Sequence, residues 1–356
     1  MSEAILPDII VGVDTHKHTH AAVAITGLGA RLGELTIEVS LEGYRELETW
    51  ARSLGAISAF GIEGTGSYGA GLARFLRAAG HTVHEAGRPD RGLRHRHGKT
   101  DHLDAEGAAR AVLGGQATAL PKAGTGEVEM IRHLKVARDT AVKARTQAML
   151  ALKAIILNAP AALREQLDAL AGKMALVRHL AAFRPGPLTT TTASAKASLR
   201  AIARRWLHLD LEIRSHDAHL NRLTERCAPE MVAAHGMGTA TAAEMLVVVG
   251  DEPERIRSEA AFAKLCGACP VPASSGKTSK HRLNRGGHRQ ANAALHRVVV
   301  VRMRTHQPTL DYVRRRTAEG KSKREIIRCL KRFVAREIFG YLCRRPKAVR
   351  PAQIAT

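Results

Sequence analysis

Aromatic side chains are scarce in this sequence of 356 residues, because Phe, Trp and Tyr together make up only 3% of it. RNA-recognition modules and single-strand binding grooves stack bases on aromatic rings, so this scarcity argues against a stacking platform. Acidic residues are also few: 33 Asp and Glu stand against 55 Lys and Arg, which gives a formal charge of +22. Such an excess is unlike that of an ordinary neutral metabolic enzyme. It makes nucleic acid, held through its phosphates, the leading partner.

Cysteine, long apolar runs and nucleotide-binding motifs are lacking as well. The five Cys begin only at Cys227, too few and too late for a disulfide framework, so we expect reduced thiols in a cytoplasm. No run of about 18 apolar residues and no signal peptide is found, so we expect no membrane partner. A Walker A element is missing, which argues against use of ATP. With 45% hydrophobic residues, the chain can nevertheless build cores for two or three domains.

The positive charge is unevenly distributed along the chain. Residues 1–120 carry 12 basic and 14 acidic side chains, and residues 121–263 carry 20 and 15. Residues 264–350 carry 23 basic and only 4 acidic side chains. Phosphate binding is therefore expected mainly in the C-terminal third.

The N-terminal third alternates short apolar runs with helical periodicity. The expected elements are strands at 9–14, 21–26 and 35–39, a helix at 41–54, a strand at 58–63, a helix at 68–79 and a strand at 81–85. This β-β-β-α-β-α-β order is that of an α/β domain of the ribonuclease-H or RuvC type.

Four acids have positions that suggest a shared site. Asp14 closes the first expected strand, Glu63 closes the fourth, and Asp101 and Asp104 lie on one face at the start of a helix. In a ribonuclease-H-like sheet the first and fourth strands are neighbours, so the four carboxylates converge. The carboxylates of such a cluster repel one another unless divalent cations neutralise them. Two Mg²⁺ ions about 4 Å apart can activate one oxygen and stabilise the leaving oxygen when a phosphodiester is cleaved. Taken singly, an Asp at a strand end is also typical of a turn, and the position of Asp101 is also consistent with a helix N-cap.

The middle of the chain shows heptad spacing in two segments. Within 127–158, apolar residues recur every seven positions, and Arg138 and Arg145 interrupt the companion stripe. The second stripe consists of Leu199, Ile202, Trp206, Leu209, Ile213, His216, Leu220, Leu223 and Cys227. These stripes predict either an antiparallel hairpin within one chain or a self-association arm. Residues 184–193 are expected to form the loop between the two helices.

A glycine turn begins the C-terminal part. Gly236 and Gly238 precede Thr239 and an apolar helix, so that backbone amides at the helix N-terminus can face a phosphate. This arrangement resembles a helix-hairpin-helix, although a plain helix connection also needs glycine. The mainly α C-terminal domain ends in an expected helix at 322–345 with one apolar face. Its other face carries Arg324, Arg328, Lys331, Arg332 and Arg336.

A serine beside glycine stands in the most basic region, in the sequence from Pro270 through Ser274 and Ser275 to Gly276. A flexible backbone and nearby cations suit a phosphoryl-transfer nucleophile, although Ser-Gly is also common in ordinary loops. The expected phosphate contacts around these sites are Lys99, Lys277, Lys280, Arg282, Arg285 and Arg289, together with Arg324, Arg328 and Arg332 of the last helix.

Two groups of possible metal ligands are discounted. Cys266 and Cys269, with His281 and His288 downstream, only loosely imitate a zinc site because their spacing is unusual. A run of alternating histidines at 16, 18 and 20 is expected along one strand face, without a metal role.

Taken together, these motifs resemble those of the IS110-family (DEDD) transposases of bacterial insertion sequences, nearly from end to end. The segments similar to the family's RuvC-like acidic tetrad are Val11-Gly12-Val13-Asp14 with Lys17, Glu63-Gly64-Thr65-Gly66, and Lys99-Thr100-Asp101 with Asp104. Residues 236–251 and 262–295 are similar to the C-terminal transposase domain. Its Pro-x-x-x-x-Ser-Gly element runs here from Pro270 to Gly276, which assigns the family's nucleophilic serine to Ser275 rather than its neighbour Ser274.

The resemblance implies a recombinase that moves an insertion sequence. It implies a RuvC-like catalytic domain at 1–122, a helical coiled-coil oligomerisation region at 123–230 and a basic transposase domain at 231–350. Mg²⁺ held by Asp14, Glu63, Asp101 and Asp104 would deprotonate or position the hydroxyl of a serine that comes from another protomer of a dimer or tetramer. Attack of this serine on DNA would give a phosphoserine intermediate. A noncoding RNA from the element would pair with donor and target DNA, at the nucleoid of a bacterial cytoplasm.

Two other functions remain open at this point. One is a RuvC-type, Mg²⁺-dependent endonuclease that cuts branched DNA without a covalent serine intermediate. The other is a nucleic-acid-binding protein without catalysis, although the presence of all four acids and the serine argues against it.

Overall fold

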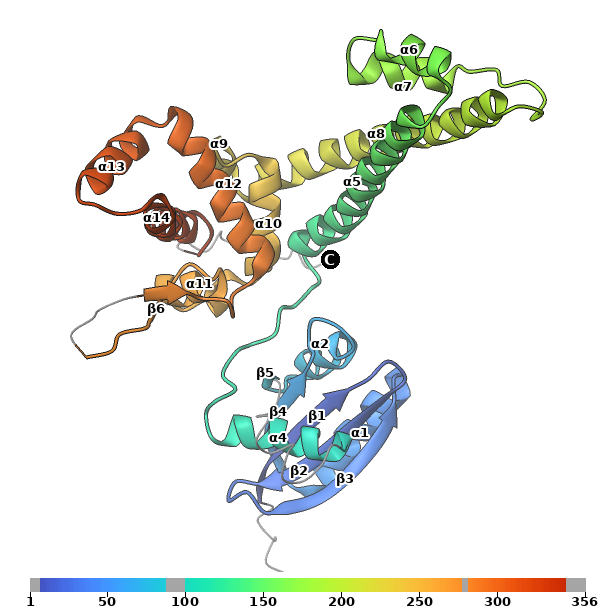
Figure 1. The fold of residues 1–356 in the computed structure, drawn as a ribbon. Coiled ribbons are helices and arrows are strands. Elements are labelled where there is room, and N and C mark those ends of the chain that lie inside the picture. The colour runs from blue at the N-terminus through green and yellow to red at the C-terminus, as the bar shows by residue number, and fades with distance from the viewer. Residues whose placement is uncertain (1–6, 88–99, 277–280, 344–356) are drawn as a thin grey trace, which may run out of the picture. The chain divides into compact units, whose positions relative to one another are not determined.

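The computed structural model describes residues 7–87, 100–276 and 281–343, and the chain divides into two compact units, Met1–Ala123 and Gly124–Thr356 (Figure 1). The elements of the first unit are β1 (Asp8–Thr15), β2 (Thr19–Thr26), β3 (Arg31–Glu38), α1 (Leu41–Leu54), β4 (Ala56–Glu63), α2 (Ala70–Ala78), β5 (Val83–Ala86) and α4 (Asp101–Leu113).

The first unit is a mixed α/β domain around a five-stranded sheet of order β3-β2-β1-β4-β5. β1, β2 and β3 form an antiparallel meander, whereas β4 runs parallel to β1 and β5 parallel to β4. The expected order of elements and the pairing of the first and fourth strands are thus confirmed. β3 begins at Arg31 rather than at the expected Leu35. The sequence did not predict this start, because most residues of this edge strand are exposed and its first residues form no apolar run.

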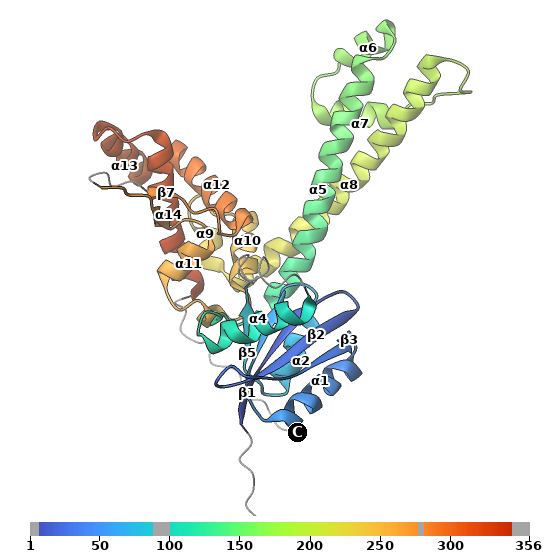
Figure 2. The same cartoon turned by 60° about the horizontal axis from the view of Figure 1, so that its bottom comes forward.

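Helices cover both faces of this sheet (Figure 2). α1 and α2 pack on one face against Val11, Val13 and Phe60, whereas α4 packs on the other against Ile10 and Val23. Successive residues of β1 therefore enter different cores, as strand geometry requires.

Two glycines let α4 lie directly on the strands. A Cβ on Gly12 of β1 would overlap the backbone at Ala105 and Ala109, and one on Gly61 of β4 would lie 2.7 Å from the carbonyl oxygen of Ala108. Any side chain at these positions would push the helix off the sheet. The closeness of this packing fixes where the first turn of α4 stands relative to the ends of β1 and β4.

The second unit is mainly helical. Its elements are α5 (Glu127–Leu157), α6 (Ala161–Asp168), α7 (Lys173–Ala181), α8 (Thr191–Cys227), α9 (Pro229–Ala233), α10 (Thr239–Val249), the 3₁₀ turn η1 (Pro253–Arg255), α11 (Glu259–Leu265), β6 (Pro270–Pro272), β7 (His281–Leu283), α12 (Arg289–Thr305), α13 (Gln307–Ala318) and α14 (Lys323–Cys343).

The long helices α5 and α8 run side by side as an antiparallel hairpin, so the first of the two expected arrangements is confirmed (Figure 1). The arginines that interrupt the heptad stripe of α5 pair across it. Arg138 Nε lies 2.7 Å from Asp217 Oδ1, and Arg145 pairs with Asp210 one heptad away on each helix. We call residues 127–227, which include α6 and α7, the helical arm.

The loop expected at 184–193 is wrong at its C-terminal end. α8 already begins at Thr191, because Thr190 caps it: the Thr190 hydroxyl accepts a hydrogen bond from Ala193 N at 3.1 Å. Threonine is a good N-cap residue, so a run of threonines can start a helix instead of forming a loop.

Helix α10 is buried on nearly all sides, because α5, α8, α9, α12 and α14 pack against it. Its Glu244 is 5% exposed and pairs with the half-buried Lys135 of α5 at 2.8 Å, so this ion pair ties the arm to the core around α10.

The last helix departs from the expected division into two faces. Lys331 is not on an exposed basic face: it is 7% exposed, and its Nζ donates a hydrogen bond to Asn292 Oδ1 at 2.8 Å. The apolar stripe of α14 also includes Ala335 and Phe339, because both α11 and α12 pack against this helix and cover a wide face. Burial, and secondarily Arg328, lowers the pKa of Lys331.

In the parts of the chain that the structure describes, no helix combines the length and the apolar character needed to cross a membrane.

Candidate active site

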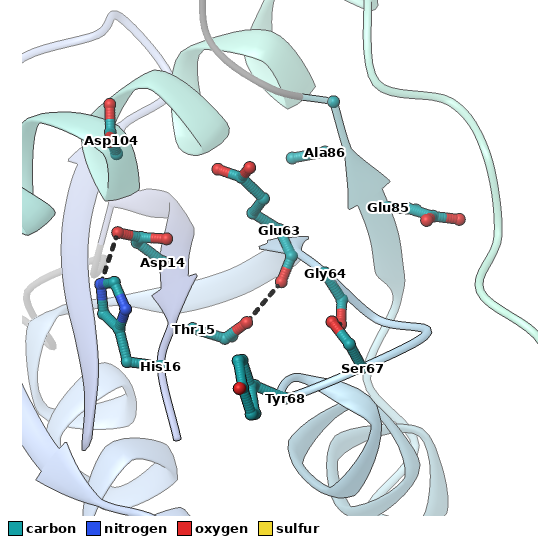
Figure 3. Close-up of a pocket in the computed structure, with 11 residues that line it drawn as sticks. Asp14, Thr15, His16, Glu63, Gly64, Ser67, Tyr68, Glu85, Ala86 and Asp104 are labelled. Carbon is teal, nitrogen blue, oxygen red and sulfur yellow. Dashed lines mark hydrogen bonds and ion pairs between the residues drawn. The ribbon is translucent and has the colours of Figure 1, made fainter. Parts of the chain in front are cut away.

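The ends of β1 and β4 and the first turn of α4 surround a cavity of about 570 Å³ in the first unit (Figure 3). Its lining residues are Asp14, Thr15, His16, Glu63, Gly64, Ser67, Tyr68, Glu85, Ala86, Gly87 and Asp104. Three of the four acids expected to cluster therefore share one cavity.

The strand pairing brings the first two acids together. Val13 of β1 pairs with Ile62 of β4, so Asp14 and Glu63 follow at the same edge of the sheet. The Thr15 hydroxyl donates a hydrogen bond to the Glu63 carbonyl oxygen at 2.8 Å, which ties the two strand ends together. Asp14 is only 8% exposed, whereas Glu63 is half-buried.

The start of α4 supplies the other two acids. Thr100 caps this helix, and its hydroxyl accepts a hydrogen bond from Leu103 N at 3.3 Å. Asp101 and Asp104 then fall in the first turn, where the helix dipole favours negative charge. Asp104 is buried and lines the cavity, whereas Asp101 is exposed and lies beside Asp14 and His16.

The surroundings of Asp14 disfavour its negative charge. Burial raises the pKa of Asp14 above its ordinary value; the nearby His16 opposes this effect, and the negative charges of Asp104 and Asp101 add to it. Carboxylates in such a position are held near one another at a cost in electrostatic repulsion. A bound cation would relieve that repulsion.

His16 is a member of this site that the sequence interpretation missed. Its Nε2 lies 3.2 Å from Asp14 Oδ2 and 3.3 Å from Asp101 Oδ1. The expectation that His16, His18 and His20 share one strand face is wrong, because β1 ends at Thr15 and β2 begins at Thr19. The first two histidines lie in the turn, while His20 is buried in β2. The available signal was a histidine two residues after the acid that closes a strand.

The donor set fits a divalent cation. Asp14, Glu63 and Asp104 offer oxygen atoms around the cavity, and oxygen is what Mg²⁺ and Mn²⁺ accept. The ligand atoms of Asp14, His16 and Asp101 all lie within 4.8 Å of one another. Among the described residues, this trio is the only group of three or more such side chains that meets this distance limit.

Ser275 lies in the second unit, after strand β6 of a two-stranded hairpin. Pro270 pairs with Leu283 and Pro272 with His281, so the chain from Pro270 onward forms a narrow ribbon rather than the expected plain loop. Proline is tolerated there because each strand has a partner on one side only. Ser274 and Ser275 are both exposed, and Gly276 has the positive φ of 54° that favours glycine.

Asparagine side chains hold the root of this hairpin, and Asn284, just after β7, donates from its Nδ2 to the carbonyl oxygen of Lys264 at 3.2 Å. Asn292 of α12 donates from its Nδ2 to the carbonyl oxygens of Cys266, at 2.9 Å, and Gly267, at 3.0 Å. Lys331 in turn donates to Asn292. We call Asn292 and Lys331 the hairpin latch.

The expected phosphate contacts have different surroundings. Arg282, Arg285, Arg289 and Arg324 are exposed, and Arg328 is half-buried. Arg332 is half-buried and pairs with Glu259, which also pairs with Arg336 at 3.1 Å, so the expected all-basic face contains an acid supplied by α11. Lys99, Lys277 and Lys280 lie outside the described residues.

The glycine turn between α9 and α10 has the expected form. Gly236 has a φ of 78°, and Gly238 is the exposed N-cap of α10, without a side chain that caps the helix. Thr239 begins the helix, and a hydrogen bond from Met237 N to Ala234 O closes the turn.

The discounted cysteine and histidine group has ordinary structural roles. Cys266 is fully buried, which raises the pKa of its thiol to about 12. His288 caps α12 by accepting a hydrogen bond from Ala291 N at 3.2 Å, and Cys269 Sγ accepts one from Asn284.

Comparison with known families matches two stretches of the chain to transposases. Residues 11–159 match the DEDD model of IS110 elements, described as "Transposase". Residues 232–314 match the model described as "Transposase IS116/IS110/IS902 family". Together these stretches cover more than half of the chain and contain the four acids, His16 and Ser275. No curated protein matches the sequence.

Proposed function

The chain belongs to the IS110 family of transposases, enzymes that cleave and recombine DNA, and we propose that it moves an insertion sequence by metal-dependent, serine-mediated strand exchange. One observation carries the proposal. Asp14, Glu63 and Asp104, from three elements far apart in the sequence, converge on one cavity at the edge of a sheet. Carboxylates gathered in this way suit a phosphodiester held through divalent cations.

Asp14, Glu63, Asp101 and Asp104 are proposed as the ligands of a two-metal site in a RuvC-like domain. The strand order β3-β2-β1-β4-β5 and the position of α4 support this assignment. Bound Mg²⁺ or a related ion would supply positive charge at the scissile phosphate. Asp14 and Asp104 are buried and packed, so they would hold their positions before any ion or DNA arrives.

Ser275 is proposed as the nucleophile. Its Oγ would form a bond to phosphorus as one P–O bond to deoxyribose breaks, and the displaced oxygen would leave as a hydroxyl with the proton that the serine gives up. The exposed position of Ser275 supports attack on DNA presented by another protomer. The spacing from Pro270 to Gly276 favours Ser275 over Ser274.

Residues 231–350 are proposed as the domain that grips nucleic acid. The exposed Arg282, Arg285 and Arg289 would contact phosphates of donor and target DNA, with Gly238 and Thr239 offering backbone amides. Phosphate contacts carry no sequence information. We therefore propose that a noncoding RNA of the element reads sequence by base pairing, as in other guided systems.

Residues 123–230 are proposed as the region of self-association into a dimer or tetramer. Apolar side chains on the helical arm support this, because Val136 and Leu150 are each 56% exposed and Leu211 is 66% exposed. An enzyme with these substrates would act at the nucleoid of the bacterial cytoplasm.

Trapping the covalent intermediate tests the proposal. Full-length protein is incubated with donor DNA, target DNA, the element's RNA and Mg²⁺, and covalent protein–DNA adducts are resolved after denaturation. We expect adduct with the wild type and with Ser274→Ala, and none with Ser275→Ala or Asp14→Asn.

Two results would contradict parts of this scheme. Adduct that survives Ser275→Ala would show that the nucleophile is another residue. DNA cleavage that persists in Ser275→Ala but is lost in Asp14→Asn would favour the RuvC-type endonuclease, in which water attacks and no covalent intermediate forms.

A further inference from the structure

His16 holds a position that neither the fold nor the proposed strand exchange explains. Its side chain extends from the β1–β2 turn, which is closed by a hydrogen bond from His16 N to Thr19 O at 3.1 Å. The imidazole is 46% exposed, yet its Nε2 faces a carboxylate oxygen of Asp14 (Figure 3). The same Nε2 also faces a carboxylate oxygen of Asp101. An N–H group of the imidazole can point at only one of the two carboxylates. A cation bound by Nε2 and by both carboxylates would instead interact with all three groups at once.

The distances have the scale of a coordination shell. Six ligands about 2.1 Å from one ion place neighbouring donor atoms about 3.0 Å apart and opposite ones about 4.2 Å apart. The Nε2 atom of His16 is 3.2 Å from Asp14 Oδ2 and 3.3 Å from Asp101 Oδ1. All three donor atoms lie within 4.8 Å of one another, which small side-chain adjustments would contract onto one ion.

We propose that His16 Nε2 is a metal ligand, which with Asp14 and Asp101 forms a mixed nitrogen–oxygen site for one divalent ion. The inference rests on the proposed metal-dependent function and adds a fifth ligand to its four carboxylates. His16 thus belongs to the metal site itself.

The imidazole changes which ion the site prefers. Carboxylate and water ligands suit Mg²⁺ and Mn²⁺ alike, whereas imidazole favours first-row transition ions. A site that combines both donors therefore prefers Mn²⁺ to Mg²⁺. Glu63 and Asp104, which line the same cavity, offer only oxygen, so this preference depends on His16.

His18 provides a matched control. It is exposed in the same turn, two residues from His16, and its backbone oxygen accepts a hydrogen bond from Val39 N that a substitution retains. His18→Asn therefore removes an imidazole from the turn without removing the one that faces Asp14 and Asp101. The exposure of both histidines makes loss of folding by either substitution a small risk.

The test uses full-length protein and Mn²⁺ alone, without DNA. Pulsed electron paramagnetic resonance detects a ¹⁴N nucleus bound to Mn²⁺, and calorimetry measures the affinity for Mn²⁺ and Mg²⁺ separately. We expect ¹⁴N coupling in the wild type and in His18→Asn but not in His16→Asn. We also expect His16→Asn to weaken Mn²⁺ binding about tenfold and Mg²⁺ binding less than about threefold.

The outcomes separate this inference from the function on which it rests. Mn²⁺ that binds the wild type and is lost in Asp14→Asn, but shows no ¹⁴N coupling, overturns the role of His16 and leaves the carboxylate site intact. Coupling that persists in His16→Asn also overturns it. Mn²⁺ binding that is absent in the wild type, or unchanged by Asp14→Asn, overturns the proposed metal site itself.

Discussion

The cavity of the first unit and the β6–β7 hairpin of the second, which carries Ser275, are built in opposite ways. Around the cavity, Asp14 and Asp104 are buried, and α4 rests on Gly12 without space for a methyl group. On the hairpin, Ser275 is exposed at a narrow ribbon. Residues 1–120 carry slightly more acidic than basic side chains, whereas residues 264–350 carry 23 basic and 4 acidic ones.

This contrast has a physical basis in the proposed reaction. Carboxylates that gather cations must be held together against their repulsion, which requires a packed support. A nucleophile that attacks DNA needs access to the backbone and surrounding positive charge, which an exposed ribbon provides. If the carboxylates and the cations around the serine were in one core, their charges would neutralise each other. Their separation into two units therefore preserves the negative charge of the one and the positive charge of the other.

The largest effect should come from disturbing the packed support. Gly12→Ala forces a Cβ into the backbone of α4 at Ala105, so we expect the first unit to lose about 2–3 kcal/mol of unfolding free energy and its affinity for Mn²⁺. The two tryptophans make this measurable. Trp50 lies in α1 of the first unit and Trp206 in α8 of the second, so urea unfolding followed by fluorescence in Trp206→Phe and Trp50→Phe backgrounds reports each unit separately.

Gly66→Ala is the control for this substitution, because a Cβ at Gly66 meets nothing within 4 Å. It should leave both the stability and the Mn²⁺ affinity of the protein unchanged. If Gly12→Ala is as stable as Gly66→Ala, the close contact of α4 with β1 does not support the cavity.

A smaller effect is expected from weakening the basic side of the comparison. The double substitution Arg282→Gln and Arg285→Gln removes two exposed cations beside the hairpin, so DNA affinity should fall about tenfold at moderate salt. The slope of log affinity against log salt should become shallower by about 2. Fluorescence anisotropy with labelled duplex DNA measures both, and Mn²⁺ binding to the first unit should not change.

Two exposed arginines of the helical arm give a charge-matched control, Arg164→Gln with Arg205→Gln. If these two substitutions lower DNA affinity as much as Arg282→Gln with Arg285→Gln does, then DNA binding depends on the net charge of the protein and not on the proposed surface.

The sequence predicted the first unit well because its signals are local. Apolar runs and helical periodicity gave the order of strands and helices, and the strand-end positions of Asp14 and Glu63 indicated their convergence. His16 escaped notice because the boundary between β1 and β2 falls among alternating histidines, where the pattern of one continuous strand is equally consistent with the sequence. The role of Gly12 is tertiary, since it depends on a helix about 90 residues away in the chain.

In the second unit, charge was a poor guide to exposure. Lys331 follows the basic pattern of its helix, yet α11 and α12 cover that part of α14. Whether a lysine is buried depends on which elements pack from both sides, and no local pattern in α14 contains this information. The pairing of Arg332 with Glu259 likewise joins residues of two different elements.

The smallest effect concerns the hairpin latch and depends on pH. Burial lowers the pKa of Lys331, so between its folded value and the ordinary value of 10.5 the unfolded chain binds more protons than the folded one. Lys331 therefore makes the free energy of unfolding rise with pH in that alkaline range.

In Lys331→Met this rise should be lost. At neutral pH the free energy of unfolding should change by no more than about 1 kcal/mol, because relief of a buried charge offsets the lost hydrogen bond to Asn292. Urea unfolding followed by circular dichroism from pH 7 to the alkaline range measures this, with the exposed Lys323→Met as control. If Lys331→Met retains the alkaline rise, the ammonium of Lys331 is not desolvated in the folded protein.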